Sequence, residues 1–281
     1  MTSLNWSVHV TPQIPTTITD LPPDVDQRWW SPTSSTLIYG ERDAVLVDPL
    51  MTGQQADDLA DWVTAAKRHL TTIYITHGHG DHWFGLATLL KRFPDATAVA
   101  VPQVVTHMRE QAAPEFFETF WKQRFPDALP DAITVDVSEF TGSTLTLEGH
   151  RLEVINLGHT DTDDTTALWV PSVRLLVAGD AVYNDVHLYL AESPGEKKQQ
   201  WVAALDMLDQ LHPQVVVAGH KRQGRPDAPA EIAATREYIK TFEELTTKTT
   251  TTEELYQAML AIYPQRVNRG ALWGSCRATK G

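Results

Sequence analysis

The sequence is poor in cysteine, in basic residues and in long apolar runs. Cys276 is the one cysteine among 281 residues, so no intramolecular disulfide can form, as is usual in a reducing compartment. The sequence contains no run of about 18 apolar residues, the length needed to span a membrane. Residues 1–10 lack the basic and apolar regions of a secretory signal. We therefore expect a cytoplasmic protein with no membrane partner.

Acidic residues outnumber basic ones, 36 to 23, which gives a formal net charge of −13. A nucleic-acid partner needs clustered Lys and Arg to displace the counterions of the phosphate backbone. The charge balance therefore argues against a nuclease or another nucleic-acid-binding protein, and it favours a small-molecule substrate.

The segment from His77 to His82 places three histidines and one aspartate within six residues, in the order His-Gly-His-Gly-Asp-His. It directly follows an apolar run at residues 73–76, which predicts a strand. Neutral imidazoles suit zinc or iron, and a carboxylate among them is typical of a hydrolytic site with open positions for water and substrate. A solvated turn rich in histidine is the alternative. A closed structural zinc site would more often recruit paired cysteines, which this chain lacks.

Three further residues of the types that bind metals follow predicted strands. A strand-like apolar run and a glycine precede each of them, and the three are His159, Asp180 and His220. Buried strands that end at one edge of an α/β scaffold hold such side chains rigidly and leave one face of the site open. We therefore expect these residues to join the histidine cluster. Taken alone, Asp180 could instead be a helix cap or a turn residue.

This order of motifs, H-x-H-x-D-H-x-x-G over residues 77–85 and then G-H-T, G-D and G-H, resembles the metallo-β-lactamase superfamily. The resemblance spans about residues 35–221, and it is nearest to the lactonase-like dinuclear zinc branch. It implies the α/β class, with an αββα four-layer sandwich and two metal sites at one edge. Carried over residue by residue, it assigns the first site to His77, His79 and His159, the second to Asp81, His82 and His220, and the bridging position to Asp180.

The resemblance implies two zinc ions per chain, with iron, manganese or a mixed pair as alternatives. Two cations that share a bridging water lower its pKa toward neutrality and polarise a carbonyl, so hydrolysis of an acyl bond is the expected reaction. We expect Asp81 to hold the nucleophile and to pass a proton to the leaving group. Tyr183 stands at the spacing after Asp180 where lactone-hydrolysing members carry a tyrosine, and its phenol could donate to the oxyanion. A packed aromatic residue at the strand end is the alternative.

Aromatic residues near the histidine motif predict an apolar or ring-bearing substrate. Trp83 and Phe84 follow His82 directly, and Trp83 is the stronger candidate for substrate contact. A predicted helical insertion at residues 104–126 adds Phe117 and Trp121. These two belong either to a lid or pocket wall over the site or to core packing.

The remaining pattern predicts one domain over residues 1–281, in which strands and helices alternate. Strands are expected at residues 36–39, 44–47, 73–76, 98–101, 144–147, 151–155, 167–170, 174–178 and 215–217, and helices at residues 56–70 and 86–93. A C-terminal helical extension at residues 229–265 contains helices at 230–245 and 252–262. Thr251 and Glu254 are spaced as a capping box for the second of these. The extension could shape a substrate pocket or the surface of a homodimer.

Departures from the family patterns narrow the expected activity. One class of zinc β-lactamase needs a cysteine where Asp180 stands, and another lacks the bridging carboxylate, so penicillin hydrolysis is not expected as the main activity. Asp-Thr-Asp-Asp at residues 161–164 stands where relatives carry Pro or Gly, and these carboxylates could orient the ligand imidazoles. The leading hypothesis is a dinuclear zinc hydrolase of a lactone or another carboxylic ester.

Three alternatives stay open. The first is a thioesterase of the glyoxalase II kind, which is weakened because the C-terminal segment lacks an evident basic signature for glutathione carboxylates. The second is a mono-iron oxygenase of the same superfamily, which would use only His77, His159 and Asp180 as ligands. The third is a non-catalytic interaction protein on a retired scaffold, which is disfavoured because no ligand is missing.

Overall fold

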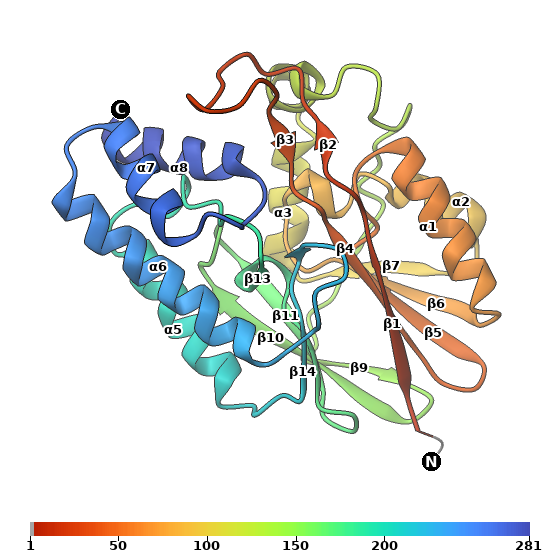
Figure 1. Cartoon of the computed structure of the whole chain (residues 1–281). Coiled ribbons are helices and arrows are strands. Elements are labelled where there is room, and N and C mark those ends of the chain that lie inside the picture. Colours follow the sequence, from red (N-terminus) through yellow and green to blue (C-terminus); the bar gives the residue numbers. More distant parts are fainter. Residues whose placement is uncertain (1–2) are drawn as a thin grey trace.

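Two β-sheets face each other at the centre of the fold, and helices cover both outer faces (Figure 1). The computed structural model describes residues 3–281. Helices α1 (Gly53–Ala65) and α2 (Leu86–Arg92) lie on the first sheet, whereas α5 (Lys197–Asp209) and α6 (Ala230–Lys248) lie on the second. Each sheet and its helices bury their apolar faces against each other, which is why the layers alternate as they do. The predicted αββα sandwich is confirmed.

The first sheet has six strands in the order β1-β4-β5-β6-β7-β8. β4 pairs antiparallel with both β1 and β5, and the pairs from β5 to β8 are parallel. The strands are β1 (Asn5–Val10), β4 (Ser34–Tyr39), β5 (Asp43–Val47), β6 (His69–Tyr74), β7 (Thr97–Ala100) and β8 (Ser138–Glu139).

The second sheet has five strands in the order β14-β12-β11-β10-β9, in which β12 and β14 pair in parallel and the other neighbours antiparallel. They are β9 (Thr144–Leu147), β10 (His150–Gly158), β11 (Thr165–Val170), β12 (Leu175–Val177) and β14 (Val215–Val217). Two short pairs complete the strands: β2 (Ile14–Pro15) with β3 (Trp29–Trp30), and β13 (Tyr183–Asn184) with β15 (His220–Lys221).

Helix α1 shows how local sequence and packing agree. Thr52 and Gln55 form a capping box at its N-terminus, and its buried residues recur at helical spacing. The predicted helix over residues 56–70 is too long, however, because α1 ends at Ala65. Lys67 adopts a left-handed conformation with φ 54°, and His69 already begins β6. Neither signal is visible in the apolar pattern, which continues through Leu70 into the strand.

The helical segments after β7 and at the C-terminus lie on one side of the sandwich (Figure 1). The first comprises α3 (Pro102–Gln111), α4 (Pro114–Phe116) and a π-helical stretch, Phe117–Lys122. The second continues from α6 into α7 (Thr252–Ile262) and α8 (Arg269–Lys280), which packs on α7 and β3. The predicted helix at residues 252–262 agrees with α7. Neither β1 nor α8 was predicted, because Gly270 and Gly274 interrupt the pattern of α8.

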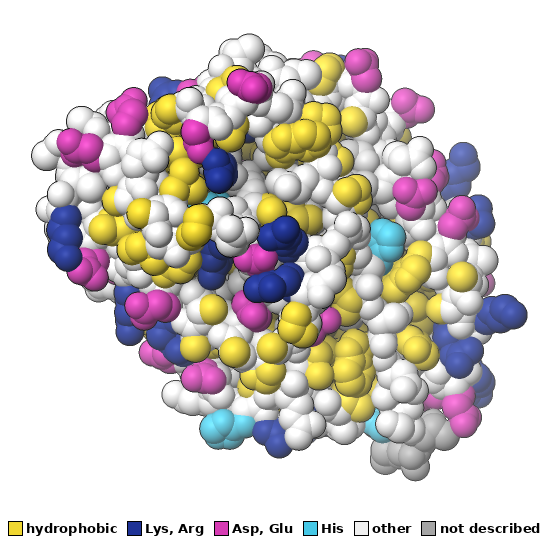
Figure 2. Space-filling view, viewed as in Figure 1, with side chains coloured by type: hydrophobic (Ala, Val, Ile, Leu, Met, Phe, Trp, Pro, Cys, Tyr) yellow, Lys and Arg dark blue, Asp and Glu magenta, His cyan; other side chains and the backbone are white. Residues whose placement is uncertain are grey.

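Charged side chains are mixed over the surface. On the face in Figure 2, Lys and Arg are interspersed with Asp and Glu, and they form no continuous basic stripe. Within residues 3–281, no helix combines the length and the apolar character needed to cross a membrane.

The capping box of α7 gives a test of the C-terminal fold. Thr251 accepts a hydrogen bond from the Glu254 amide, and the Glu254 side chain accepts one from the Thr251 amide. We expect Thr251→Ala to lower the free energy of unfolding by about 1 kcal/mol, measured by urea denaturation, because the Glu254 amide loses its partner. Thr252→Ala, one residue further on, is the matched control and should not destabilise, since Ala favours a helix interior. Equal losses in both variants would contradict the role of the cap.

Candidate metal centre

The loops that follow parallel strands bring most of the predicted ligands to one edge of the sandwich. The histidine motif at residues 77–82 lies after β6 and ends in a 3₁₀ turn. Asp180 lies in a second 3₁₀ turn after β12, and His220 begins β15. Because parallel strands end at the same edge of a sheet, side chains far apart in the sequence meet there.

The first candidate metal site consists of His77, His79 and Asp161. His79 Nδ1 lies 2.9 Å from Asp161 Oδ2, and His77 Nε2 lies 3.8 Å from the same oxygen. His77 and Asp161 are buried, and His79 is half-buried. The three ligand atoms lie within 4.8 Å of one another, which is close enough for one ion to contact all of them.

The second candidate site consists of Asp81, His82 and His220, whose ligand atoms also lie within 4.8 Å of one another. His220 Nε2 is 3.4 Å from Asp81 Oδ2. All three side chains are buried. The structure therefore brings together the three residues expected in this site.

Asp180 lies between the two groups. Its Oδ1 is 3.1 Å from His82 Nε2, and its Oδ2 is 3.0 Å from His220 Nε2 and 4.0 Å from His77 Nε2. One carboxylate thus reaches imidazoles of both groups. This placement fits the bridging role that the family resemblance implies.

His159 is the predicted ligand that belongs to neither candidate group. No group of candidate ligands found among residues 3–281 includes it. Its Nδ1 lies 2.7 Å from Asp163 Oδ1 and its Nε2 lies 2.8 Å from Ser193 Oγ, so both ring nitrogens already have partners. The structure thus leaves His159 outside the group around His77, and its assignment to the first site stays a prediction. Asp161, which was expected only to orient ligands, stands beside His77 and His79 instead.

The centre passes a test of fit for metal ions. Four of its buried polar atoms make no hydrogen bond of acceptable geometry, although imidazoles and carboxylates lie within ion-pair distance of them: His77 Nε2, His82 Nε2, Asp161 Oδ2 and Asp180 Oδ1. Buried polar atoms in proteins are almost always satisfied, so such a concentration of exceptions needs an explanation. Imidazole nitrogens and carboxylate oxygens are ligands for zinc, iron and manganese, and bound cations would satisfy all four atoms.

Asp48 and Thr76 orient two of the candidate ligands. Asp48 Oδ2 lies 3.0 Å from His82 Nδ1 and accepts a hydrogen bond from Thr76 Oγ1, which in turn lies 3.0 Å from His77 Nδ1. These contacts occupy Nδ1 of both rings and leave Nε2 for a metal ion. Sequence reasoning missed Asp48, although it follows the buried strand β5 just as Asp180 follows β12. The strand-end signal could have found it.

The other two imidazoles are oriented in the same way. His220 Nδ1 donates to the carbonyl oxygen of Pro32 at 3.1 Å, and His79 Nε2 lies 3.4 Å from Glu192 Oε2. The other nitrogen of each ring therefore faces a candidate ligand carboxylate: His220 Nε2 faces Asp180, and His79 Nδ1 faces Asp161. Such contacts fix both the tautomer and the orientation of a ligand.

Burial and neighbouring charges set the protonation states of the centre. Burial and His82 lower the pKa of His77 to about 4, which keeps its ring neutral. Burial also lowers the pKa of His220, but Asp180 and Asp81 outweigh it and raise this pKa to about 9. Burial opposes the charge of Asp180, yet His220 and His82 hold its pKa well below the usual range. His220 must therefore release a proton when a metal ion binds.

Two glycines allow the strand ends to approach so closely. Gly179 has φ 53°, which favours glycine, and it is tied to the second loop because the Gly219 amide donates to its carbonyl oxygen at 2.8 Å. A Cβ atom at Gly219 would lie 2.1 Å from Asp180 Oδ1. The glycine before each of these ligands is therefore a steric requirement of the centre.

The aromatic residues next to the histidine motif are core residues. Trp83 and Phe84 are fully buried, and Trp83 Nε1 donates to the carbonyl oxygen of Gly78 at 2.8 Å. Phe117 packs on Phe84, with ring centroids 5.5 Å apart. The expectation that these three line the substrate pocket is corrected, because none of them lines the cavity at the centre. The turn at residues 80–82 directs Trp83 and Phe84 inward, and Phe117 packs on Phe84. Trp121 does line the cavity.

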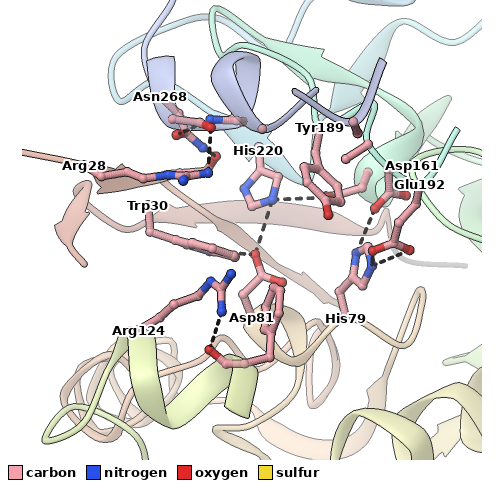
Figure 3. A pocket seen from close by; sticks show the side chains of 18 of the residues that line it. Arg28, Trp30, His79, Asp81, Arg124, Asp161, Tyr189, Glu192, His220 and Asn268 are labelled. Carbon is pink, nitrogen blue, oxygen red and sulfur yellow. Dashed lines mark hydrogen bonds and ion pairs between the residues drawn. The ribbon is translucent and has the colours of Figure 1, made fainter. Parts of the chain in front are cut away.

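A cavity of about 460 Å³ opens onto the centre (Figure 3). Asp81, Asp180 and His220 line its inner end. Its aromatic wall comes from three separate parts of the chain and consists of Trp29, Trp30, Phe116, Phe120, Trp121 and Tyr189. Within this wall, Trp30 Nε1 donates to Asp81 Oδ2 at 3.0 Å. The cavity is thus apolar along its side and ionised at its base.

Tyr183 lines the same cavity from β13. Its hydroxyl donates to Asp180 Oδ2 at 3.1 Å, and the side chain is buried. Burial and the charge of Asp180 raise the pKa of this phenol well above its usual value, so it keeps its proton. The structure thus places a phenolic hydrogen beside the candidate bridging carboxylate.

The fold and the centre together define an αββα protein with adjacent histidine and carboxylate groups for metal binding. The sequence model of the metallo-beta-lactamase superfamily matches residues 28–220, which is more than half of the chain. The chain belongs to that superfamily, which includes metal-dependent hydrolases.

Individual relatives share either part of the sequence or the fold. The hydroxyacylglutathione hydrolase of Francisella tularensis is 35% identical over 78 residues, which cover 26% of this chain and 29% of that enzyme. The type 2 metallo-beta-lactamase of Bacteroides fragilis is 23% identical over 220 residues, 77% of this chain and 79% of that enzyme. A metallo-beta-lactamase family protein from Thermus thermophilus has 20% identity and a TM-score of 0.64, covering 97% of this chain and 91% of that chain.

Metal content can test whether Asp161 or His159 completes the first site. We expect Asp161→Asn to lose about one metal ion per chain, because a neutral amide is a poor ligand. His159→Asn, two residues away, should retain the metal content of the unmodified protein. Elemental mass spectrometry on dialysed protein measures both. The opposite pattern, with loss only in His159→Asn, would restore His159 as the ligand.

Proposed function

We propose that the chain is a dinuclear zinc hydrolase that cleaves a lactone or another carboxylic ester. The observation that carries the proposal is the pair of histidine and carboxylate groups that share Asp180 at the base of one cavity. His77, His79 and Asp161 would hold one ion, and Asp81, His82 and His220 the other. Bound in this way, two zinc ions supply a hydroxide nucleophile at neutral pH and polarise the carbonyl of the substrate.

Asp81 is the residue proposed to transfer the proton from the nucleophile to the leaving group. Its Oδ2 accepts the indole hydrogen of Trp30, and it lies 3.4 Å from His220 Nε2. Burial opposes its charge, but the imidazoles of His82 and His220 hold its pKa well below the usual range. The carboxylate is therefore ionised and ready to accept a proton from the nucleophile, which it can pass on to the leaving group.

Tyr183 is the residue proposed to stabilise the oxyanion. Its phenol is protonated and lies at the base of the cavity, where it donates to Asp180 in the structure. A hydrogen bond of this kind strengthens as negative charge develops on the carbonyl oxygen in the transition state. Rotation about the C–O bond of the phenol would redirect its hydrogen from Asp180 to a substrate oxygen.

The aromatic wall favours a substrate with an apolar or ring-bearing body. Trp30 and Trp121 pack edge to face, with ring centroids 5.6 Å apart, and Phe125 packs on Trp30 at 5.4 Å. Rigid aromatic walls of this kind bind apolar groups without losing much side-chain freedom. The interspersed surface charges support a small molecule rather than a nucleic acid as the partner.

A thioester is the second candidate substrate, because the hydroxyacylglutathione hydrolases share sequence with this chain. The match covers under a third of those enzymes, so it supports the reaction type more than the substrate. The mono-iron oxygenase hypothesis would need His159 beside His77. Since His159 contacts Asp163 and Ser193, this arrangement supports the oxygenase hypothesis less than the hydrolase proposal.

Metal content and acyl turnover together test the proposed function. Protein purified without chelators should contain about two zinc ions per chain by elemental mass spectrometry. It should hydrolyse members of a panel of γ-lactones, δ-lactones and aryl esters, and treatment with a chelator should abolish this activity. A single iron per chain with oxygen uptake on a persulfide would replace the proposal with oxygen chemistry. Preferential cleavage of thioesters would favour the second candidate.

The role of Tyr183 is tested on the best lactone of that panel. We expect Tyr183→Phe to lower kcat by about tenfold or more with little change in KM, because the lost hydrogen bond is formed mainly in the transition state. Tyr263→Phe removes a hydroxyl that bonds Thr241 outside the cavity, and it serves as the control. An unchanged kcat in Tyr183→Phe would remove this role.

A further inference from the structure

Two arginines line the cavity beside Trp30, and they come from distant parts of the chain. Arg28 lies just before β3, and Arg124 follows the π-helical stretch after α4. In Figure 3 both guanidinium groups approach from the side opposite His79 and Glu192, with Asp81 and His220 between. The cavity therefore has a cationic side that is separate from its candidate metal groups.

Arg124 is held rigidly but is not neutralised. Its guanidinium carbon lies 3.6 Å from the centroid of the Phe120 ring, and its Nη1 donates to the carbonyl oxygen of Phe120 at 2.7 Å. Among residues 3–281, no ion pair joins Arg124 to a carboxylate. Burial and the neighbouring Arg28 lower its pKa, and Tyr189 is the group that acts in the opposite direction.

Arg28 is only partly compensated. Its Nη2 donates to the carbonyl oxygen of Gly270 at 2.8 Å, and its Nη1 lies 3.7 Å from Asp20 Oδ2. Asp20 also pairs with Arg277 at 2.6 Å and accepts a hydrogen bond from Trp273. One carboxylate thus serves two of the three guanidinium groups that line the cavity. In a chain with a net charge of −13, this local excess of positive charge is a specific feature of the cavity.

We propose that Arg124, together with Arg28, binds a carboxylate or another anionic group at the far end of an apolar acyl substrate. A guanidinium group presents a fixed fork of donors that matches a carboxylate, and a ring beneath it keeps the fork in place. The body of the substrate would lie on Trp30 and Trp121, with its scissile carbonyl at the candidate metal groups. The acyl nature of this substrate rests on the function proposed above, whereas the anion site does not.

Binding of an aromatic sulfonate tests the anion site without requiring turnover. The probe is naphthalene-2-sulfonate, whose sulfonate is a weak zinc ligand, and its uncharged counterpart is 2-naphthalenemethanol. Isothermal titration of the metal-loaded protein should show at least tenfold tighter binding of the sulfonate, because the charge-assisted hydrogen bonds have no counterpart in the alcohol.

Arg124→Gln should remove this preference and leave the affinity for the alcohol nearly unchanged. Arg109→Gln is the matched control, because Arg109 lies on α3 beside Glu139 and does not line the cavity. Undiminished sulfonate binding in Arg124→Gln would overturn the proposal and place the anion on the metal ions or elsewhere. Equal affinity of the unmodified protein for the two probes would overturn it as well.

A pair of esters then connects the anion site with the reaction. Mono-4-nitrophenyl glutarate carries a terminal carboxylate, and 4-nitrophenyl pentanoate has the same chain length without one. The glutarate should have a kcat/KM at least tenfold higher, and Arg124→Gln should abolish this difference through KM. No turnover of either ester would count against the proposed hydrolase, whereas the sulfonate result would still decide the anion site. Equal effects of Arg124→Gln on both esters would overturn the proposed specificity.

Discussion

Three carboxylates, Asp81, Asp161 and Asp180, are buried beside four imidazoles at one edge of the sandwich. Ionised groups that leave water repel each other strongly unless opposite charge lies beside them. Protonated imidazoles provide that charge in the metal-free chain, as the raised pKa of His220 indicates, and divalent cations would provide it more effectively. The surrounding structure has to hold these groups together against their repulsion and against the pull of solvent.

The two sheets share this task. Behind the centre, the Thr166 amide of β11 donates to the carbonyl oxygen of Thr76 at 3.0 Å, and the Thr166 hydroxyl lies 2.7 Å from the Tyr74 hydroxyl. The Ser34 amide of β4 donates to the Gly219 carbonyl oxygen at 2.8 Å. Each sheet is thereby bonded to a loop that follows a strand of the other sheet. A centre built across such contacts is rigid, which is what a site of fixed charge requires.

The base and the walls of the cavity come from different parts of the fold. Its base is formed by strand ends of the sandwich, whereas its walls come from segments outside it: residues 20–31, the π-helical stretch with the flanking Phe116 and Arg124, the loop at residues 189–192, and α8. π-Helical turns in proteins frequently lie at functional sites, because the extra residue turns side chains out of register. Here the stretch carries Phe120 and Trp121 and leads to Arg124. Trp30 is the residue of these segments that also bonds a candidate metal ligand, Asp81.

The sequence by itself determined the parts of this protein that depend on local pattern. The histidine motif, the glycine before Asp180 and His220, and the strands that end there carried the family resemblance, which implied the sandwich and the second candidate metal group. Only the tertiary structure showed that Asp161 lies beside His77 and that Ser193, from a distant loop, contacts His159. It also decided that Trp83 faces the core and that Arg124 faces the cavity. Side-chain direction depends on which segments pack together, and no local pattern of residues encodes that.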